Sequence, residues 1–198
     1  MAGGHQFDPT ILREYDIRGI VPDTLAPEDV NIIGRAFGSI MVERGFKTAA
    51  VGYDGRLSSP QLEAALVGGL VSTGVDVTKI GRGPTPMLYY AQTTLPTDAG
   101  LMITGSHNPP DYNGIKLVLD GKPFFADDIR WLGECAGRGD FTIGEGKVTE
   151  KAVLSDYVAR LLSDYEPGGG APLKVAWDAG NGAAGEALTR LCEGLPGS

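Results

Sequence analysis

A serine, a histidine and an asparagine stand together directly after a short apolar segment of the chain. Residues 100–104 are mostly apolar, which predicts a buried strand. Ser106, His107 and Asn108 follow, with a glycine before them and two prolines after them, so the chain must turn here. The glycine permits a tight turn, and the prolines stiffen the exit. The pattern predicts a hydroxyl on a constrained loop at the carboxyl end of a strand, where open α/β sheets bind ligands.

Serine hydrolase chemistry is one interpretation of the adjacent serine and histidine, but it is poorly supported. A nucleophilic serine of that kind needs a histidine base that a carboxylate orients. The chain has two histidines, His5 and His107, and the place of His107 beside the serine makes this geometry awkward. The Gly-x-Ser-x-Gly elbow is absent, since Pro109 follows Asn108. A polar turn in which Ser106 and Asn108 bond to nearby backbone is the simpler alternative.

Cationic residues occur on both sides of the serine loop in the sequence. Arg18 follows Tyr15 and Asp16 in a loop that enters the first predicted strand. Its side chain has two interpretations. A surface ion pair with Glu14 or Asp16 would contribute little to stability, whereas a planar guanidinium can bind phosphate through two hydrogen bonds. Lys116 lies in a predicted strand over residues 114–119, which we expect beside the serine loop at an edge of the sheet.

Three separate motifs of this sequence resemble those of one enzyme family, in the same order along the chain. They read Tyr15-Asp16-Ile17-Arg18-Gly19, then Gly83-Pro84-Thr85-Pro86, then Thr104-Gly105-Ser106-His107-Asn108-Pro109 with Tyr112-Asn113-Gly114-Ile115-Lys116. The family is that of the α-D-phosphohexomutases, the phosphomannomutase/phosphoglucomutase family. The resemblance covers essentially the whole chain, although the chain covers well under half of a typical member.

The resemblance implies an isomerase that works by phosphoryl transfer. Ser106 would carry a phosphoryl group, give it to a hexose monophosphate and recover the other phosphate from the resulting bisphosphate. The net result is exchange between the 1- and 6-phosphates of mannose or glucose. Ser106, His107 and Lys116 would be catalytic, with Lys116 or His107 as the acid/base. Tyr15, Arg18 and Asn108 would bind substrate, with holding of the loop as the favoured alternative for Asn108.

The resemblance also implies cofactors. Mg²⁺ would bind an oxygen of the phosphorylated Ser106, while its other ligands belong to an Asp-Gly-Asp-x-Asp-Arg loop that does not occur in this sequence. Glucose 1,6-bisphosphate would act as activator, and a hexose phosphate would be the substrate. Two alternatives stay open. They are a phosphoglucosamine mutase, and a non-catalytic module that binds sugar phosphates or nucleotides.

Strands and helices alternate through the first three quarters of the chain. We expect a helix over 27–44 and a second helix that Ser59 caps and that has Pro60 at its first position. We expect strands over 48–53, 75–80 and 98–104, and a turn at 54–56. Such alternation predicts a three-layer α/β/α domain with a mixed, mostly parallel sheet over residues 1–150. Residues 137–147 are rich in glycine and charge, which predicts a linker.

Residues 151–198 predict a linker helix and the truncated start of a second α/β domain. We expect a helix over 149–165, a second linker at 167–170, a strand over 173–177 and a helix over 182–192. Residues 180–185 match Gly-x-Gly-x-x-Gly, which is typical of a dinucleotide loop or, as in the family above, of a structural βα turn. One strand cannot cover its own faces, so this segment should be mobile, lie against the first domain or self-associate with another copy.

Composition limits the classes of partner. The net charge of −8 argues against binding to nucleic acid but not to a small anion. The longest apolar runs are too short to span a membrane. The two cysteines, Cys135 and Cys192, are far apart, which favours a reducing, cytoplasmic location over a disulfide framework or a zinc site.

Overall fold

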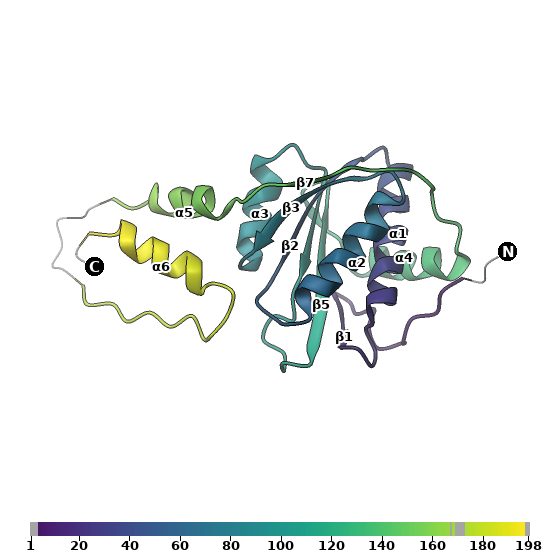
Figure 1. Ribbon diagram of the computed structural model, residues 1–198, viewed down its shortest axis with the longest axis horizontal. Helices are drawn as coiled ribbons and strands as arrows, with labels where there is room; N and C mark the ends of the chain where they lie inside the picture. Colours follow the sequence, from purple (N-terminus) through teal and green to yellow (C-terminus); the bar gives the residue numbers. More distant parts are fainter. Residues whose placement is uncertain (1–3, 167, 169–172, 197–198) are drawn as a thin grey trace.

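The computed structural model describes residues 4–166, 168 and 173–196, and Figure 1 shows their arrangement. These residues form seven strands and six helices. The strands are β1 (Ile17–Ile20), β2 (Thr48–Tyr53), β3 (Asp76–Arg82), β4 (Ala99–Ile103), β5 (Tyr112–Leu119), β6 (Lys122–Pro123) and β7 (Val148–Glu150). The helices are α1 (Pro27–Glu43), α2 (Ser59–Val71), α3 (Thr85–Thr94), α4 (Asp127–Arg138), α5 (Leu154–Leu162) and α6 (Gly185–Gly194). None of the described helices is long and apolar enough to cross a bilayer.

The sheet is mixed, and a single strand reverses its direction. Its order is β1-β5-β4-β2-β3-β7, with β6 paired to β5. The pairs β2–β3, β2–β4 and β3–β7 are parallel, whereas β5 is antiparallel to β4, β1 and β6. All strands except β5 therefore run the same way. The expectation that residues 114–119 lie at an edge is wrong, because β1 pairs with the outer side of β5.

Helices cover both faces of the sheet, which confirms the predicted three-layer α/β/α architecture (Figure 1). Val51 and Leu101 point to one face and pack in a large apolar core with α1, α2 and α4. Ala50 and Met102 point to the other face and pack in a smaller core with α3. This division follows from the alternation of side chains along a strand. Because β2, β3 and β4 run parallel, their carboxyl ends lie at the same end of the sheet.

The predicted linker at 137–147 is packed against the domain. The backbone amides of Gly144 and Gly146 donate to the carbonyls of Ser72 and Val71 at 2.9 and 2.8 Å. A Cβ at Gly146 would lie 2.0 Å from the carbonyl oxygen of Val75, so glycine is needed for this close approach. The chain then adds β7 to the sheet, and the expectation of a helix from residue 149 is wrong by five residues, since α5 begins at Leu154.

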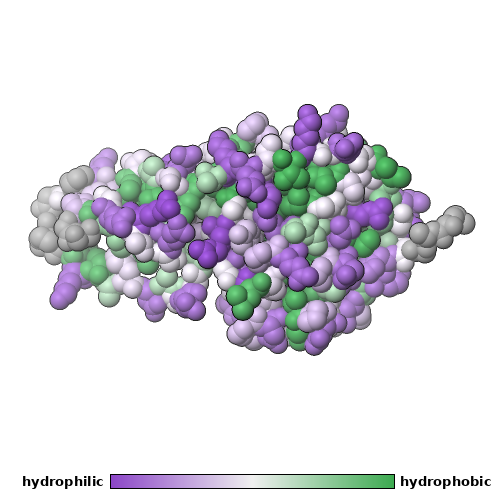
Figure 2. Space-filling view, in the orientation of Figure 1, coloured by the Kyte–Doolittle hydropathy of each residue, from purple (hydrophilic) through white to green (hydrophobic). Residues whose placement is uncertain are grey.

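Residues after β7 form a narrower C-terminal lobe, seen beside the sheet domain in Figures 1 and 2. Helices α5 and α6 pack together there. The expected strand over 173–177 is wrong, because those residues form no ladder in the part of the chain that the structure describes. Leu173, Val175 and Trp177 are exposed instead, which is the physical result of a strand without a partner. The predicted linker at 167–170 lies outside the described residues except for Gly168.

Candidate active site

Ser106 lies just beyond the carboxyl end of β4, at the end of the sheet where β2 and β3 also finish. The amide of Thr104 still pairs with the carbonyl of Gly114 on β5, at 2.9 Å. Two residues later the side chain of Ser106 is exposed and its backbone has φ of 52°, in the left-handed region. Non-glycine residues adopt this conformation at a cost, and only where surrounding structure enforces it. The serine is therefore held in place by contacts elsewhere in the loop.

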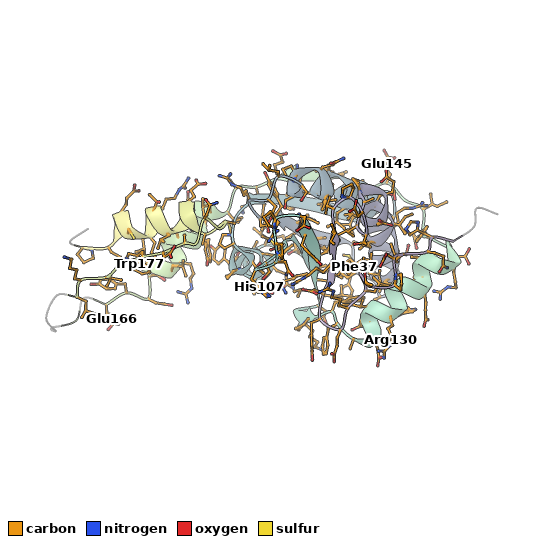
Figure 3. All side chains as sticks on the ribbon, turned by 90° about the horizontal axis from the view of Figure 1, so that it is seen from below. Phe37, His107, Arg130, Glu145, Glu166 and Trp177 are labelled. Carbon is orange, nitrogen blue, oxygen red and sulfur yellow. The ribbon has the colours of Figure 1, made fainter. Side chains whose placement is uncertain are left out.

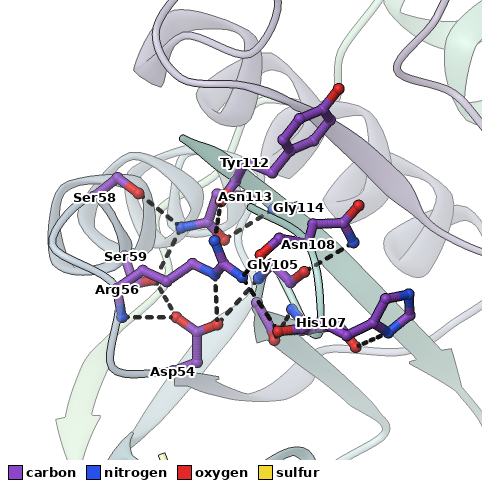
Figure 4. Close-up of polar contacts among 12 residues, drawn as sticks. Asp54, Arg56, Ser58, Ser59, Gly105, His107, Asn108, Tyr112, Asn113 and Gly114 are labelled. Atoms are coloured by element: carbon purple, nitrogen blue, oxygen red, sulfur yellow. Dashed lines mark hydrogen bonds and ion pairs between the residues drawn. The ribbon is translucent and has the colours of Figure 1, made fainter. Parts of the chain in front are cut away.

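Arg56 supplies most of these contacts, as Figure 4 shows. Its Nη1 donates to the carbonyls of Pro109 and Tyr112 at 2.5 and 2.8 Å. Its Nη2 donates to the carbonyls of Ser106 and Asn108 at 3.2 and 2.7 Å. The sequence predicts only a turn at 54–56, so this role was missed. No local pattern marks it, because the contacts join positions about fifty residues apart.

Asp54 links Arg56 to the base of the loop. Its Oδ1 accepts hydrogen bonds from the amide of Arg56 and the hydroxyl of Ser59, at 3.0 and 2.6 Å. Its Oδ2 accepts from the amide of Gly105 at 3.0 Å and lies 3.4 Å from Nε of Arg56. Ser59 was expected to cap α2. The structure places Ser58 at the cap and directs the Ser59 hydroxyl to Asp54.

Gly105 is required for a reason other than the tight turn expected of it. The positive φ belongs to Ser106, and Gly105 is not among the residues with this conformation. A Cβ at Gly105 would lie 2.1 Å from Nε and 2.2 Å from Cζ of Arg56. Glycine thus makes room for the guanidinium underneath the loop.

His107 and Asn108 have different surroundings. Nδ1 of His107 lies 3.2 Å from Oγ of Ser106, and both side chains are exposed. The amide nitrogen of the Asn108 side chain donates to the carbonyl of Gly105 at 3.0 Å. His107 is therefore placed to exchange a proton with the serine hydroxyl, whereas Asn108 braces the loop.

Arg18, Asp16 and Lys116 form a second group on β1, β5 and the segment before β1. The pairings of Arg18 with Gly114 and of Lys116 with Met102 direct both cations to the face of the sheet that α3 covers farther along. Asp16 pairs with Arg18, and its Oδ2 lies 3.6 Å from Nζ of Lys116. Arg18 is 8% exposed, and its Nε has no hydrogen-bond partner among the described residues. The role of Asp16 as the shared anion between two cations was not predicted.

A cleft of about 800 Å³ lies in front of the serine loop. Residues 54–58, 83–85 and 180–184 line its walls together with Ser106, His107 and Asn108. The Gly-Pro-Thr motif at 83–85 is thus at the same cleft as the serine. Figure 3 shows His107 on the side of the sheet domain nearest the C-terminal lobe. Tyr15 and Lys116 line a neighbouring hollow of about 340 Å³. The structure therefore brings Ser106, His107 and Asn108 together and places Arg18, Lys116 and Tyr15 in a separate group.

Comparison with known proteins agrees with this geometry. The sequence profile of "Phosphoglucomutase/phosphomannomutase, alpha/beta/alpha domain I" matches residues 9–142. A phosphomannomutase/phosphoglucomutase of Pseudomonas aeruginosa is 45% identical over 186 residues, which are 94% of this chain and 40% of that protein. A phosphoglucomutase of Neisseria meningitidis is 39% identical over 93% of this chain and 40% of its own length. A solved phosphoglucomutase/phosphomannomutase family protein from Burkholderia thailandensis superposes with a TM-score of 0.91 at 40% identity, over 96% of this chain and 43% of that one.

The chain belongs to the phosphoglucomutase/phosphomannomutase family. This confirms the family to which the three sequence motifs pointed. The matched profile is that of domain I, and it contains the serine loop, Arg18 and Lys116. The chain spans about 40% of the length of these curated relatives.

A magnesium site of the phosphoglucomutase/phosphomannomutase family is not formed by the residues described here alone. They contain no group of three or more His, Cys, Asp or Glu side chains that could hold a metal ion. The carboxylate nearest the loop, Asp54, already accepts from the amides of Arg56 and Gly105 and from Ser59. A phosphate on Ser106 could supply one ligand, so the other ligands would have to come from outside this part of the chain.

The Gly-x-Gly-x-x-Gly match at 180–185 lacks the context of a dinucleotide loop. That fingerprint needs a strand before the turn, and residues 173–179 form none in the described structure. Helix α6 begins at Gly185, and the turn before it forms one wall of the cleft in front of Ser106.

Proposed function

We propose that this chain is the phosphoserine-bearing part of a mutase that moves phosphate between the 1- and 6-positions of mannose or glucose. Residues 1–150 would be its first domain, and residues 151–198 the start of a second. The observation that carries the proposal is the exposed hydroxyl of Ser106, held with a φ of 52° at the mouth of a cleft of about 800 Å³. A hydroxyl so fixed suits phosphoryl transfer, which depends on positioning and on stabilisation of charge.

The proposed reaction has two transfers. In the first, a hydroxyl of the hexose monophosphate attacks the phosphorus on Ser106, the Oγ–P bond breaks and a hexose bisphosphate forms. In the second, Oγ of Ser106 attacks the other phosphate of the bisphosphate, and the isomeric monophosphate leaves. Each step moves one proton from the attacking hydroxyl and returns one to the leaving oxygen.

His107 and Lys116 are the candidates for these proton transfers. His107 is in the better position in this structure, with Nδ1 at 3.2 Å from Oγ of Ser106. Lys116 and Arg18 carry positive charge beside Asp16, and Arg18 keeps an unpartnered buried Nε. Two cations beside one carboxylate leave local positive charge, which would attract an anionic substrate. Tyr15, stacked on Phe125 with ring centroids 6.3 Å apart, would flank the sugar.

Cofactors remain part of the proposal. Mg²⁺ bound to the phosphate of Ser106 would supply positive charge, and glucose 1,6-bisphosphate would load the serine. The negative charge of the chain as a whole suits no nucleic-acid partner. A cytoplasmic location and self-association through residues 151–198 stay predictions.

The test is a chimera in which this chain replaces the matching segment of the Pseudomonas aeruginosa enzyme. We expect turnover of mannose 1-phosphate or glucose 1-phosphate in a coupled assay, and ³²P from labelled glucose 1,6-bisphosphate retained on Ser106. Ser106→Ala should abolish both, while Ser163→Ala, an exposed serine of the C-terminal lobe, should change neither. A chimera that is folded and binds hexose phosphate but retains no ³²P would favour the non-catalytic module. Preference for glucosamine phosphates would favour the phosphoglucosamine mutase.

A further inference from the structure

Arg56 lines the cleft of the proposed phosphoserine, where an arginine would ordinarily be read as a phosphate ligand. A guanidinium has five N–H donors. In this structure Nη1 donates to two carbonyls, Nη2 donates to two more, and Nε faces Oδ2 of Asp54. The side chain is 15% exposed. Both Nη nitrogens are therefore committed to loop carbonyls, and Nε faces a carboxylate, so no donor of Arg56 is directed to a substrate phosphate.

The four carbonyl oxygens of residues 106, 108, 109 and 112 converge on this one cation. Four partial negative charges repel one another unless a positive group stands between them, so their convergence depends on the guanidinium. We propose that Arg56 is a positioning residue, which fixes Ser106 for phosphoryl transfer by holding the backbone of residues 106–112. The inference rests on the proposed function of Ser106.

Asp54 and Gly105 complete this clamp. Asp54 balances the charge of Arg56 and at the same time accepts from the amide of Gly105, directly before the serine. The absence of a side chain at Gly105 admits the guanidinium, because a Cβ there would lie 2.1 Å from Nε. The left-handed backbone of Ser106, with φ of 52°, is the conformation that this clamp maintains.

A double-mutant cycle on the 198-residue chain tests the clamp without reference to activity. Arg56→Ala and Gly105→Ala should each raise the hydrogen-exchange rates of the Ser106 and Asn108 amides by roughly tenfold or more, as expected when a local opening becomes easier. In the Arg56→Ala background, Gly105→Ala should add less than about twofold, since its only predicted damage is displacement of Arg56. Arg56→Lys should be intermediate, because an ammonium offers three donors and no fork. Arg130→Ala, at an exposed arginine of α4, is the matched control and should change nothing.

The kinetic half uses the chimera described above. Arg56→Ala should lower kcat by roughly 10²-fold, the scale of a misplaced reacting group, with KM within about threefold. Arg56→Lys should recover part of kcat. A raised KM with unchanged kcat would make Arg56 a substrate ligand and overturn the proposal, as would unchanged exchange in Arg56→Ala or multiplicative effects in the cycle. A third outcome separates the two proposals. If Arg56→Ala and Gly105→Ala are non-additive in hydrogen exchange but the unsubstituted chimera shows no phosphoserine and no turnover, the proposed function fails. Arg56 then holds the loop without a role in phosphoryl transfer.

Discussion

Asp98→Ala is expected to destabilise the sheet domain by about 2–3 kcal/mol at neutral pH. Asp98 stands just before β4, and its Oδ2 accepts three hydrogen bonds at the start of β2. These come from the amide of Lys47 at 2.8 Å, the amide of Thr48 at 2.9 Å and the hydroxyl of Thr48 at 2.8 Å. One carboxylate therefore ties together the two strands that lead to Asp54 and to Ser106.

The magnitude follows from how well each donor is shielded from water. The bonds from Thr48 are partly buried, and each is worth about 1–1.5 kcal/mol net, since the acceptor is charged but water reaches part of the site. The bond from Lys47 is exposed, so water replaces it and little is lost. Asp98→Asn keeps an acceptor without the charge, and about half of the effect is expected.

The pH dependence has a definite sign. Burial alone would raise the pKa of Asp98, but the hydrogen bonds from Lys47 and Thr48 outweigh burial and lower it from its ordinary value of 3.8. A carboxyl group with a lowered pKa in the folded state contributes stability above its unfolded pKa and loses it as the pH falls through the folded value. The difference in free energy of unfolding between the native chain and Asp98→Ala should therefore be largest at pH 7 and should shrink below about pH 4.

The assay is urea unfolding at pH 7 and at pH 3, with the slope of the transition as a check that both variants unfold alike. Asp76→Ala is the matched control. Asp76 stands at the start of β3, and its Oδ1 accepts one exposed bond from the amide of Lys147 at 2.7 Å. Its loss should cost less than about 1 kcal/mol. Equal effects of the two substitutions, or an Asp98 effect that persists undiminished at pH 3, would refute the reasoning.

Three further predictions concern residues 139–150, the cations Arg18 and Lys116, and the C-terminal lobe. Gly146→Ala should cost about 1–3 kcal/mol by overpacking and should raise hydrogen exchange in β7, whereas Gly185→Ala, with open space around it, should do neither; a silent Gly146→Ala would contradict the close packing. In the chimera, Arg18→Ala and Lys116→Ala should each lower turnover by roughly 10²-fold, and only the buried Arg18 should also lower the unfolding midpoint; normal turnover would remove both from the site. Limited proteolysis of the 198-residue chain should cut first between residues 163 and 184, with 139–150 protected; a first cut within 139–150 would show that this segment is not docked.

The layers of the fold could be predicted because their signals are local. The apolar stripe and the proline at the start of 27–44 predict α1, which ends one residue earlier than expected. The strands over 48–53 and 98–104 are short buried runs between turn residues, and both were found. Position within the sheet is not a local property. The pairing of β1 with β5 joins residues nearly a hundred positions apart, so the sequence did not show that β5 is covered.

The wrong assignments at residues 149–153 and 173–177 have a common cause. Residues 148–150 are Val-Thr-Glu, too short a strand to show any periodicity, and β7 exists because β3 offers it a parallel partner. Residues 173–177 alternate well but find no partner among the described residues, and no strand forms. Strand formation follows the available edge more than the propensity of the segment.

Some residues around the serine loop could be predicted from the sequence, and others could not. Ser106, His107, Arg18 and Lys116 could be predicted as site residues, because phosphoryl transfer needs a hydroxyl, an acid/base and cations. Their catalytic roles stay predictions. Arg56 holds the backbone of the serine loop, a role that no residue type or spacing marks in a sequence. Its contacts in the structure show this role.

The contacts that fix the serine loop arise inside the sheet domain. They come from Asp54, Arg56 and Gly114, and the amide of Val21 also donates to the carbonyl of Asp111 at 2.8 Å. The cleft in front of the loop, by contrast, has its opposite wall in residues 180–184. The conformation of Ser106 should therefore form without the rest of a family member, whereas the shape of the proposed sugar-binding cleft depends on the C-terminal lobe. We expect the 198-residue chain to show an ordered serine loop, but no mutase turnover above background in a coupled assay with glucose 1-phosphate. The chain spans about 40% of the length of its relatives, and its described residues hold no group of metal ligands. Turnover by this chain alone would mean that the chemistry needs no groups beyond those that residues 1–198 supply.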